Sequence, residues 1–201
     1  MSPRPVDKEL KRKQIMEAAL ELYKDKGFTE TTVEEIAIRA GIGKGTVYGY
    51  FKSKEEVALS LIGNVFNRQS EEFRNFKFSS DDQEKAIRDF LQLAMGDVDE
   101  FSSVILIFFE IWSSQKGKSM GLNRILSERF EKMAFHLNRI ILDGKKKGVF
   151  RADLNRKTLI SMIVSSIDGL LLFFTLYKPR KSSIQNRIRE LEAMIIQYLK
   201  S

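Results

Sequence analysis

The chain has 201 residues and a formal net charge of +7, with hydrophobic and charged fractions of 43% and 30% that are ordinary for a soluble globular protein. It contains no cysteine, which excludes a disulfide framework and thiolate chemistry and suits a cytoplasmic protein. The longest uninterrupted apolar run is the six residues Val104 to Phe109, and the basic start is followed by no apolar segment. We therefore expect neither a membrane-spanning segment nor a secretory signal.

The first predicted elements are a short basic arm and a long helix. Pro3 and Pro5 keep the first residues out of a helix, and Arg4 gives them a charge that either reaches a minor groove or is incidental. A helix is predicted from about residue 7 to residue 26, and Gly27 ends it. Its inner face carries Ile15, Ala18, Ala19 and Leu22.

Two short helices joined by a glycine turn are predicted between Thr32 and Lys54. Thr32 and Glu35 fit the S/T-x-x-E capping box, in which each side chain satisfies an amide at the start of a helix. Gly41 stands where a left-handed, helix-ending residue belongs, and Gly43 caps a second helix at about 44–51. This second helix buries Val47 and Phe51, and its other faces carry Lys44, Gly45, Thr46, Tyr48 and Tyr50.

This arrangement is a helix-turn-helix, which places its second helix in the major groove of DNA. Gly45 and Gly49 each cost roughly 1 kcal/mol relative to alanine, and a position without a side chain lets another backbone approach closely. The expected phosphate-binding donors are Lys44, Thr46, Tyr48, Tyr50 and Lys54. A Walker A loop would need glycine at Ile38, and a dinucleotide fingerprint would need glycine at Thr46, so both nucleotide-binding loops are excluded.

The segment from Ile15 to Val57 closely resembles the DNA-binding domain of the TetR family of bacterial repressors. The resemblance rests on I-x-E-A-A-x-E-L-Y, G-F-T-x-T-T-V-E-E-I-A, A-G-I-G-K-G-T-V-Y-x-Y-F and S-K-E-E-V. The chain departs from the family at Gly43, where serine is frequent, and at Tyr50, where histidine is frequent. The resemblance implies an all-helical homodimer with an N-terminal DNA reader and a larger C-terminal domain that binds a small effector. It also implies that Arg12 touches the DNA backbone, and Thr32 joins the candidate DNA-binding residues.

The rest of the chain is predicted to be helical, which gives an all-α fold of about nine helices. Ser53 and Glu56 form a second capping box, which starts a helix that runs to about residue 76. We place the domain boundary inside this helix, with a DNA-binding domain at 1–58 and an effector-binding and dimerisation domain at 59–201. Five later helices are predicted. The first ends near residue 95, the second spans about 101–112 and the third about 120–146. The fourth ends near residue 177, and the fifth includes 184–198.

The last two helices are too apolar for the surface of a single subunit. Small residues on the first would let another helix come close, and the second has apolar positions at the spacing of a coiled coil. A four-helix bundle formed by two subunits would bury them, although they could instead complete the subunit's own core. The candidate interface consists of Ser165, Gly169, Ile184, Ile188, Leu191, Ile195 and Tyr198.

Aromatic and methionine residues of the larger domain either fill its core or line a cavity for an apolar ligand. Glu110 and Asp168 stand inside apolar helices, so each either holds a polar group of an effector or is solvated or paired with an arginine. His136 is the only histidine, and with no cysteine beside it a structural role is favoured over a metal site. The candidate effector-binding residues are Phe66, Phe101, Phe108, Glu110, Trp112, Met133, Asp168, Phe173 and Phe174.

We interpret the chain as a ligand-responsive transcriptional regulator. It is expected to be a repressor that binds a palindromic operator in double-stranded DNA as a homodimer and is released by an apolar or amphipathic effector, without a cofactor or metal. An enzyme is disfavoured because no Ser-His-Asp order, metal cluster or phosphate loop is found. A DNA-binding protein without an effector and an activator are the alternatives, and a solid core in the C-terminal domain would favour the former.

Overall fold

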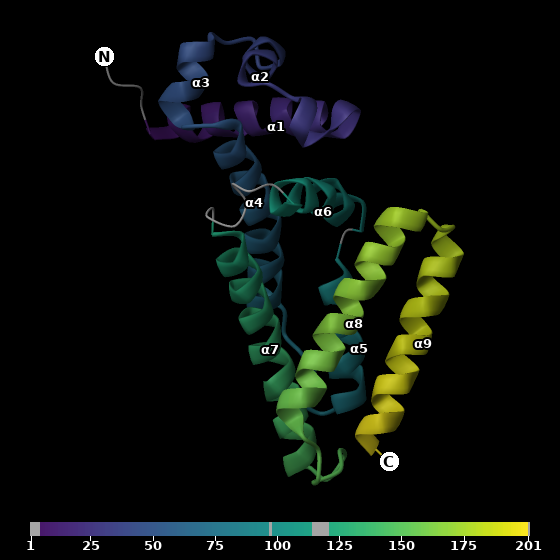
Figure 1. The fold of residues 1–201 in the computed structure, drawn as a ribbon. Coiled ribbons are helices and arrows are strands. Elements are labelled where there is room, and N and C mark those ends of the chain that lie inside the picture. Colours follow the sequence, from purple (N-terminus) through teal and green to yellow (C-terminus); the bar gives the residue numbers. More distant parts are fainter. Residues whose placement is uncertain (1–4, 97, 114–120, 201) are drawn as a thin grey trace. The chain divides into compact units, whose positions relative to one another are not determined.

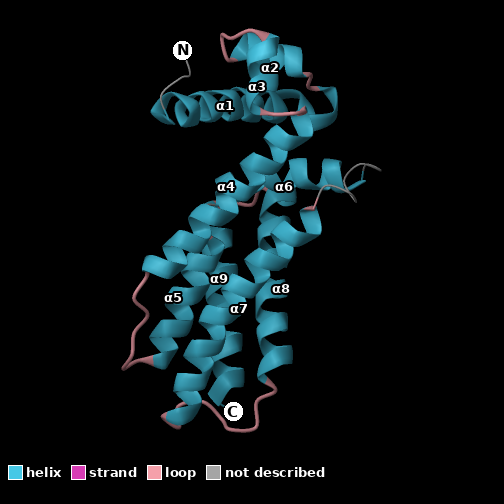
Figure 2. Cartoon of the chain, turned by 90° about the vertical axis from the view of Figure 1, so that its left-hand side faces the viewer, coloured by secondary structure: helices cyan, strands magenta, loops and turns pink. Residues whose placement is uncertain are grey.

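The computed structural model describes residues 5–96, 98–113 and 121–200, and in this part of the chain all regular secondary structure is helical (Figures 1 and 2). The predicted basic arm around Arg4 lies outside the described residues. The helices are α1 (Pro5–Glu30), α2 (Val33–Arg39), α3 (Lys44–Tyr50), α4 (Lys54–Asn75), α5 (Gln83–Met95), α6 (Val98–Ser113), α7 (Leu122–Lys146), α8 (Arg156–Tyr177) and α9 (Lys181–Lys200). The predicted all-α fold is confirmed.

The chain forms two compact units, and it passes between them three times, within α4, within α6 and near the start of α7. The first unit comprises residues 1–65 and 103–123, and the second comprises residues 66–102 and 124–201. The division within α4 falls seven residues after the predicted boundary at residue 58. The sequence contained no sign that the second half of α6 belongs with the DNA-reading helices.

The first unit is built around the buried faces of α1, α2 and α3. Ile15 and Ala19 of α1 pack in one core with Ile36 of α2 and Val47 of α3. The capping box at Thr32 is present in full, since the Glu35 amide donates to the Thr32 hydroxyl and the Glu35 carboxylate accepts from the Thr32 amide at 2.9 Å. Because these signals are local, the predicted boundaries of α2 and α3 agree closely with the structure.

The end of α1 differs from the prediction. Gly27 has φ 86° and ψ 164°, so it interrupts the helix as expected, but a further turn follows and the element ends at Glu30.

Pro5 begins α1, where a proline lacks only an amide that would have no partner in the helix. The second capping box is half formed, because Ser53 accepts from the Glu56 amide while the Glu56 carboxylate accepts from the Lys52 amide.

The second unit is a group of long helices with one apolar core. α5 contributes Ile87 and Phe90, α7 contributes Leu137, and α8 contributes Ile163 and Leu171. α8 and α9 lie side by side and antiparallel, joined by a short turn at Lys178, which is in the left-handed conformation (Figure 1). The Asn155 side chain accepts from the Thr158 amide and caps α8.

Candidate nucleic-acid interface and ligand-binding residues

α3 has one buried face and one exposed face that carries polar and aromatic side chains. Val47 and Phe51 fix the helix to the core, whereas Lys44, Thr46 and Tyr48 are exposed, with half of the Tyr48 surface accessible. An added Cβ at Gly45 or Gly49 would meet no atom within 4 Å, so both glycines leave open space beside the helix. Lys44 Nζ lies 3.2 Å from the Glu34 carboxylate, and this exposed pair is free to exchange for a phosphate. The geometry suits a helix that enters a groove of DNA.

Arg12 and Tyr50 are tied to each other inside the first unit. Arg12 Nη1 donates to the Tyr50 carbonyl at 2.9 Å, and the guanidinium lies 4.2 Å from the centre of the Phe51 ring. The side chain therefore joins α1 to the end of α3. Because an arginine has five N–H donors, a further bond from Arg12 to a phosphate stays a prediction, as do the DNA contacts of Thr32 and Tyr50.

Lys54 is engaged by its own unit, and its contact with phosphate stays a prediction. Its ammonium donates to three backbone carbonyls, those of Phe28 at 3.0 Å, Thr29 at 2.8 Å and Thr31 at 2.8 Å. It also lies 4.7 Å from the centre of the Phe28 ring. A lysine has only three N–H donors, so a phosphate could bind Lys54 only by displacing one of these carbonyls.

Glu110 contacts the same turn from the other side. Its carboxylate accepts from the Thr29 amide at 2.9 Å and from the Thr29 hydroxyl at 3.1 Å. An added Cβ at Gly27 would lie 3.3 Å from a Glu110 oxygen, so glycine is needed there both for its positive φ and for this close approach. Glu110 was predicted to bind the effector, but its carboxylate is engaged by the turn after Gly27.

The strongest polar centre of the second unit is at Arg129, which the sequence analysis missed. Arg129 is only 5% exposed; its Nη1 donates to Asp168 at 2.7 Å and its Nε to Gln69 at 3.2 Å. The guanidinium lies 5.3 Å and 5.8 Å from the ring centres of Phe66 and Phe101. Nη2 is buried and has no hydrogen-bond partner within the described part of the chain.

Three predicted effector-binding residues thus meet at one residue that was not predicted. Phe66, Phe101 and Asp168 all contact Arg129, and Asp168 is paired with an arginine, which was the alternative considered for it. On α7 the ring of Phe130 is exposed, and the neighbouring Arg129 takes the inward position. Spacing from Met133 could have identified the position, since residues four apart share a helix face.

The other candidates for the effector site make different contacts. Phe108 and Trp112 stack on each other at 5.6 Å between ring centres in the first unit. Met133 and Phe174 are buried in the second unit. Phe173 stacks on Tyr177 at 4.6 Å, and the Arg187 guanidinium lies 4.9 Å from the Phe173 ring centre.

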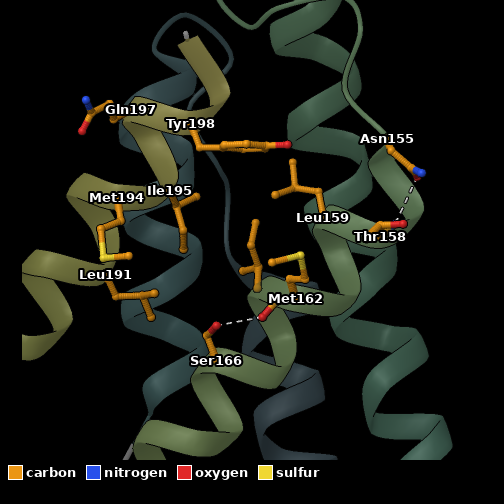
Figure 3. Close-up of a pocket in the computed structure, with 11 residues that line it drawn as sticks. Asn155, Thr158, Leu159, Met162, Ser166, Leu191, Met194, Ile195, Gln197 and Tyr198 are labelled. Atoms are coloured by element: carbon orange, nitrogen blue, oxygen red, sulfur yellow. Dashed lines mark hydrogen bonds between the residues drawn. The ribbon is translucent and has the colours of Figure 1, made fainter.

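α8 and α9 enclose an apolar groove of about 530 Å³ (Figure 3). Met162 of α8 is 63% exposed and Met194 of α9 is 67% exposed, and both line the groove together with Leu191 and Tyr198. α8 is long and apolar enough by length and composition to cross a membrane, a test that core helices of soluble proteins also pass; only 44% of its most apolar window is buried. Exposed apolar side chains of this kind indicate a surface that a partner covers.

The predicted interface residues lie on and beside this groove. Ser165, Gly169 and Tyr198 are exposed, Ile184, Ile188 and Leu191 are half-buried, and Ile195 is buried. α8 and α9 therefore bury one face in the subunit's own core and leave other apolar side chains exposed. Dimerisation itself stays a prediction.

Comparison with known proteins relates the first unit to a family of regulators. Residues 15–61 match the family described as bacterial regulatory proteins, tetR family. A fatty acid metabolism regulator protein of Bacillus subtilis (strain 168) is 27% identical over 159 residues, which are 77% of this chain and 78% of the relative. The transcriptional repressor KstR2 of Mycobacterium tuberculosis is 22% identical over 72% of each chain.

Solved structures share the whole fold. The fatty acid degradation regulator FadR from Bacillus halodurans has a TM-score of 0.70 and 20% identity, and covers 98% of this chain and 97% of its own. The regulator FadR from Bacillus subtilis, solved in complex with stearoyl-CoA, has a TM-score of 0.62 and 23% identity, and covers 94% of this chain and 97% of its own. At these identities the likeness establishes the fold alone.

Proposed function

Because the chain belongs to the TetR family of bacterial transcriptional regulators, we propose that it is a repressor that binds a palindromic DNA operator as a homodimer and is released by a small amphipathic effector. The observation that carries the DNA-binding role is the exposed face of α3, on which Lys44, Thr46 and Tyr48 stand above the buried Val47. A short helix with hydrogen-bond donors on one face, and its opposite face packed against the core, fits a major groove.

The effector is an apolar chain with an oxygen-bearing head. Arg129 offers a buried N–H donor that no described residue accepts from, and leaving such a donor unpaired is costly, so an acceptor oxygen of a ligand would stabilise it. Phe66 and Phe101 beside it offer apolar rings to the carbon chain of the same ligand. The relatives named for fatty acid metabolism and the complex with stearoyl-CoA favour a long-chain acyl thioester, whose carbonyl oxygen would take the free N–H of Arg129.

The homodimer is supported by the exposed apolar groove between α8 and α9 (Figure 3). A second copy that presents its own α8 and α9 would cover Met162, Met194 and Tyr198 and form a four-helix bundle. Two reading helices related by a twofold axis require a palindromic operator, with half-sites about one helical turn apart or a multiple of that distance.

Release requires the effector to bind unequally to two arrangements of the subunit. Typical coupling free energies are about 1–3 kcal/mol. α4, α6 and the start of α7 are the helical segments through which the chain passes between the two units, so they are the elements that the ligand would bias.

The test is binding of the purified protein to DNA from its own upstream region at stated salt, with and without a series of acyl-CoA chain lengths. We expect release by long chains, and we expect Arg129→Met to weaken release by roughly tenfold or more, since one charge-assisted hydrogen bond is lost. Arg124→Met is the control, because Arg124 lies on the same helix and is exposed.

The variants separate the possible results. Arg129→Met should retain operator binding, and if it does not fold, Arg129→Lys preserves the buried charge while removing the planar fork. Specific binding that no acyl-CoA releases would favour a regulator without this effector. Equal release of wild type and Arg129→Met would contradict the role of Arg129.

A further inference from the structure

A second groove, of about 760 Å³, lies in the second unit where the end of α4, the loop after it and the last turns of α7 meet. Its floor is aromatic. The rings of Phe73 and His136 are stacked with centres 5.5 Å apart, and Phe78 lies 6.0 Å from His136. Phe76, which is 40% exposed, also lines the groove and its ring centre is 4.9 Å from that of Phe78. The groove therefore offers flat apolar surfaces, one of them accessible.

The rim of the groove is cationic. Arg74, Lys77, Arg139 and Lys146 line it and are exposed, and no carboxylate of the described residues lies within 4 Å of their charged nitrogens. Asp143 is the single carboxylate among the described lining residues, and it already accepts hydrogen bonds from other side chains. Four cations that face one groove repel one another, and an anion placed among them relieves that repulsion.

The imidazole at the floor is consistent with this positive potential. Burial lowers the pKa of His136, and the positive charge of Arg139 lowers it further. At neutral pH the ring is therefore uncharged, and it acts as an aromatic surface that adds no further charge to the groove.

The loop that carries Phe76 and Phe78 is fixed to the ends of its neighbouring helices. Gln83 Nε2 donates to the Ser80 carbonyl at 2.8 Å and to Asp143 at 2.7 Å. The Lys147 ammonium donates to the same two residues, Ser80 and Asp143. These bonds hold the loop against α7, so the groove is formed before any ligand arrives.

We propose that this groove binds the base and phosphates of a nucleotide. Inorganic phosphate would use the cations and leave the aromatic floor unused, whereas a neutral aromatic compound would leave the cations unpaired. A nucleotide matches both features, since its base stacks on aromatic rings and its phosphates accept from lysine and arginine.

Two sources could supply this group. One is a free nucleotide. The other is the nucleotide end of the acyl-CoA proposed above, and this source rests on the proposed function. Arg129 of α7 contacts Gln69 and Phe66 of α4. His136 lies seven residues after Arg129 on α7, and it contacts Phe73, which lies seven residues after Phe66 on α4. Seven helical residues span roughly 10 Å, so one extended ligand could have its thioester at Arg129 and its nucleotide in the groove.

The experiment is titration calorimetry in 50 mM NaCl with ADP, pyrophosphate and stearoyl-CoA as separate probes. The double variant Lys77→Gln/Arg139→Gln should weaken ADP binding by roughly tenfold or more, because two phosphate partners are lost. Phe76→Ala should weaken ADP binding by roughly fivefold while leaving pyrophosphate binding unchanged, since only a base can stack. Lys157→Gln, an exposed lysine outside the groove, is the control and should change either value by less than about twofold.

The substituted side chains are exposed, so each variant is expected to fold, and circular dichroism would verify it. If the double variant weakens ADP and stearoyl-CoA to the same extent, the groove holds the nucleotide end of the effector. If it weakens ADP alone, the groove is a separate nucleotide site, whatever the outcome for the effector. ADP binding that is undetectable, or that is matched by pyrophosphate and insensitive to Phe76→Ala, would overturn the proposal.

Discussion

Lys54→Met separates two roles of a lysine beside a DNA-binding helix. The structure gives Lys54 three carbonyl acceptors at 2.8–3.0 Å within its own unit. Hydrogen bonds to a charged group contribute about 1.5–3 kcal/mol each. Water can replace the ammonium at the exposed Thr29 carbonyl. Removing a cation from the positive end of the α4 dipole stabilises the fold by about 0.5 kcal/mol. We expect a net loss of about 3 kcal/mol, which lowers the melting temperature of a chain of this size by roughly 6–12 °C.

The DNA assay gives the second half of this test. If Lys54 donates only to the turn after Gly27, the slope of log affinity against log salt should be the same for Lys54→Met and wild type. A lysine that binds a phosphate would reduce that slope by about 0.9 when removed.

Lys44→Met is the matched control for the Lys54 variant. Lys44 is exposed and paired only with Glu34 at 3.2 Å, so its loss should cost less than about 1 kcal/mol and should reduce the salt slope. An unchanged melting temperature together with a reduced slope for Lys54→Met would refute the structural role.

Two further predictions concern stability. Gly144→Ala should lower the free energy of unfolding by about 1–3 kcal/mol in urea denaturation, because the added Cβ would overlap the ring of the buried Phe150; wild-type stability would contradict that packing. The pKa of Glu35 is lowered from 4.5 to about 2 by hydrogen bonds from Lys26 and Thr32, so its carboxylate stabilises the fold above pH 4.5 and loses that effect as the pH falls toward 2. Melting temperatures of wild type and Glu35→Gln should differ at pH 7 and converge near pH 2, and a gap that does not change with pH would show that the charge is irrelevant.

The reading helices could be predicted because their signals are local. The bonds between Thr32 and Glu35 span three residues, and the positive φ of Gly41, 63°, ends α2 as its place in the sequence predicts. The apolar positions of α2 and α3 recur at helical spacing, so the pattern also identifies the buried faces. Each of these features is set by neighbours along the chain.

The polar contacts of the site could not be predicted, because their partners are distant in the sequence. Lys54 binds Phe28 26 residues away, Arg129 binds Asp168 39 residues away, and Glu110 binds Thr29 81 residues away. Helical periodicity identifies a charged residue on an apolar helix, but it does not identify the atoms that surround it after folding. The sequence therefore indicated that Glu110 and Asp168 need partners, but it did not identify Thr29 as the partner of Glu110.

The turn after Gly27 gives a physical reason for how a ligand in one unit could act on the other. Its carbonyls accept from Lys54 at the start of α4, and its Thr29 amide donates to Glu110 near the end of α6. The chain passes between the units within each of these helices, and once more near the start of α7. A ligand that shifts either helix along its axis must lengthen charge-assisted hydrogen bonds to this turn. Because each such bond contributes about 1.5–3 kcal/mol, altering one of them is enough for the coupling of about 1–3 kcal/mol that ligand-induced release requires.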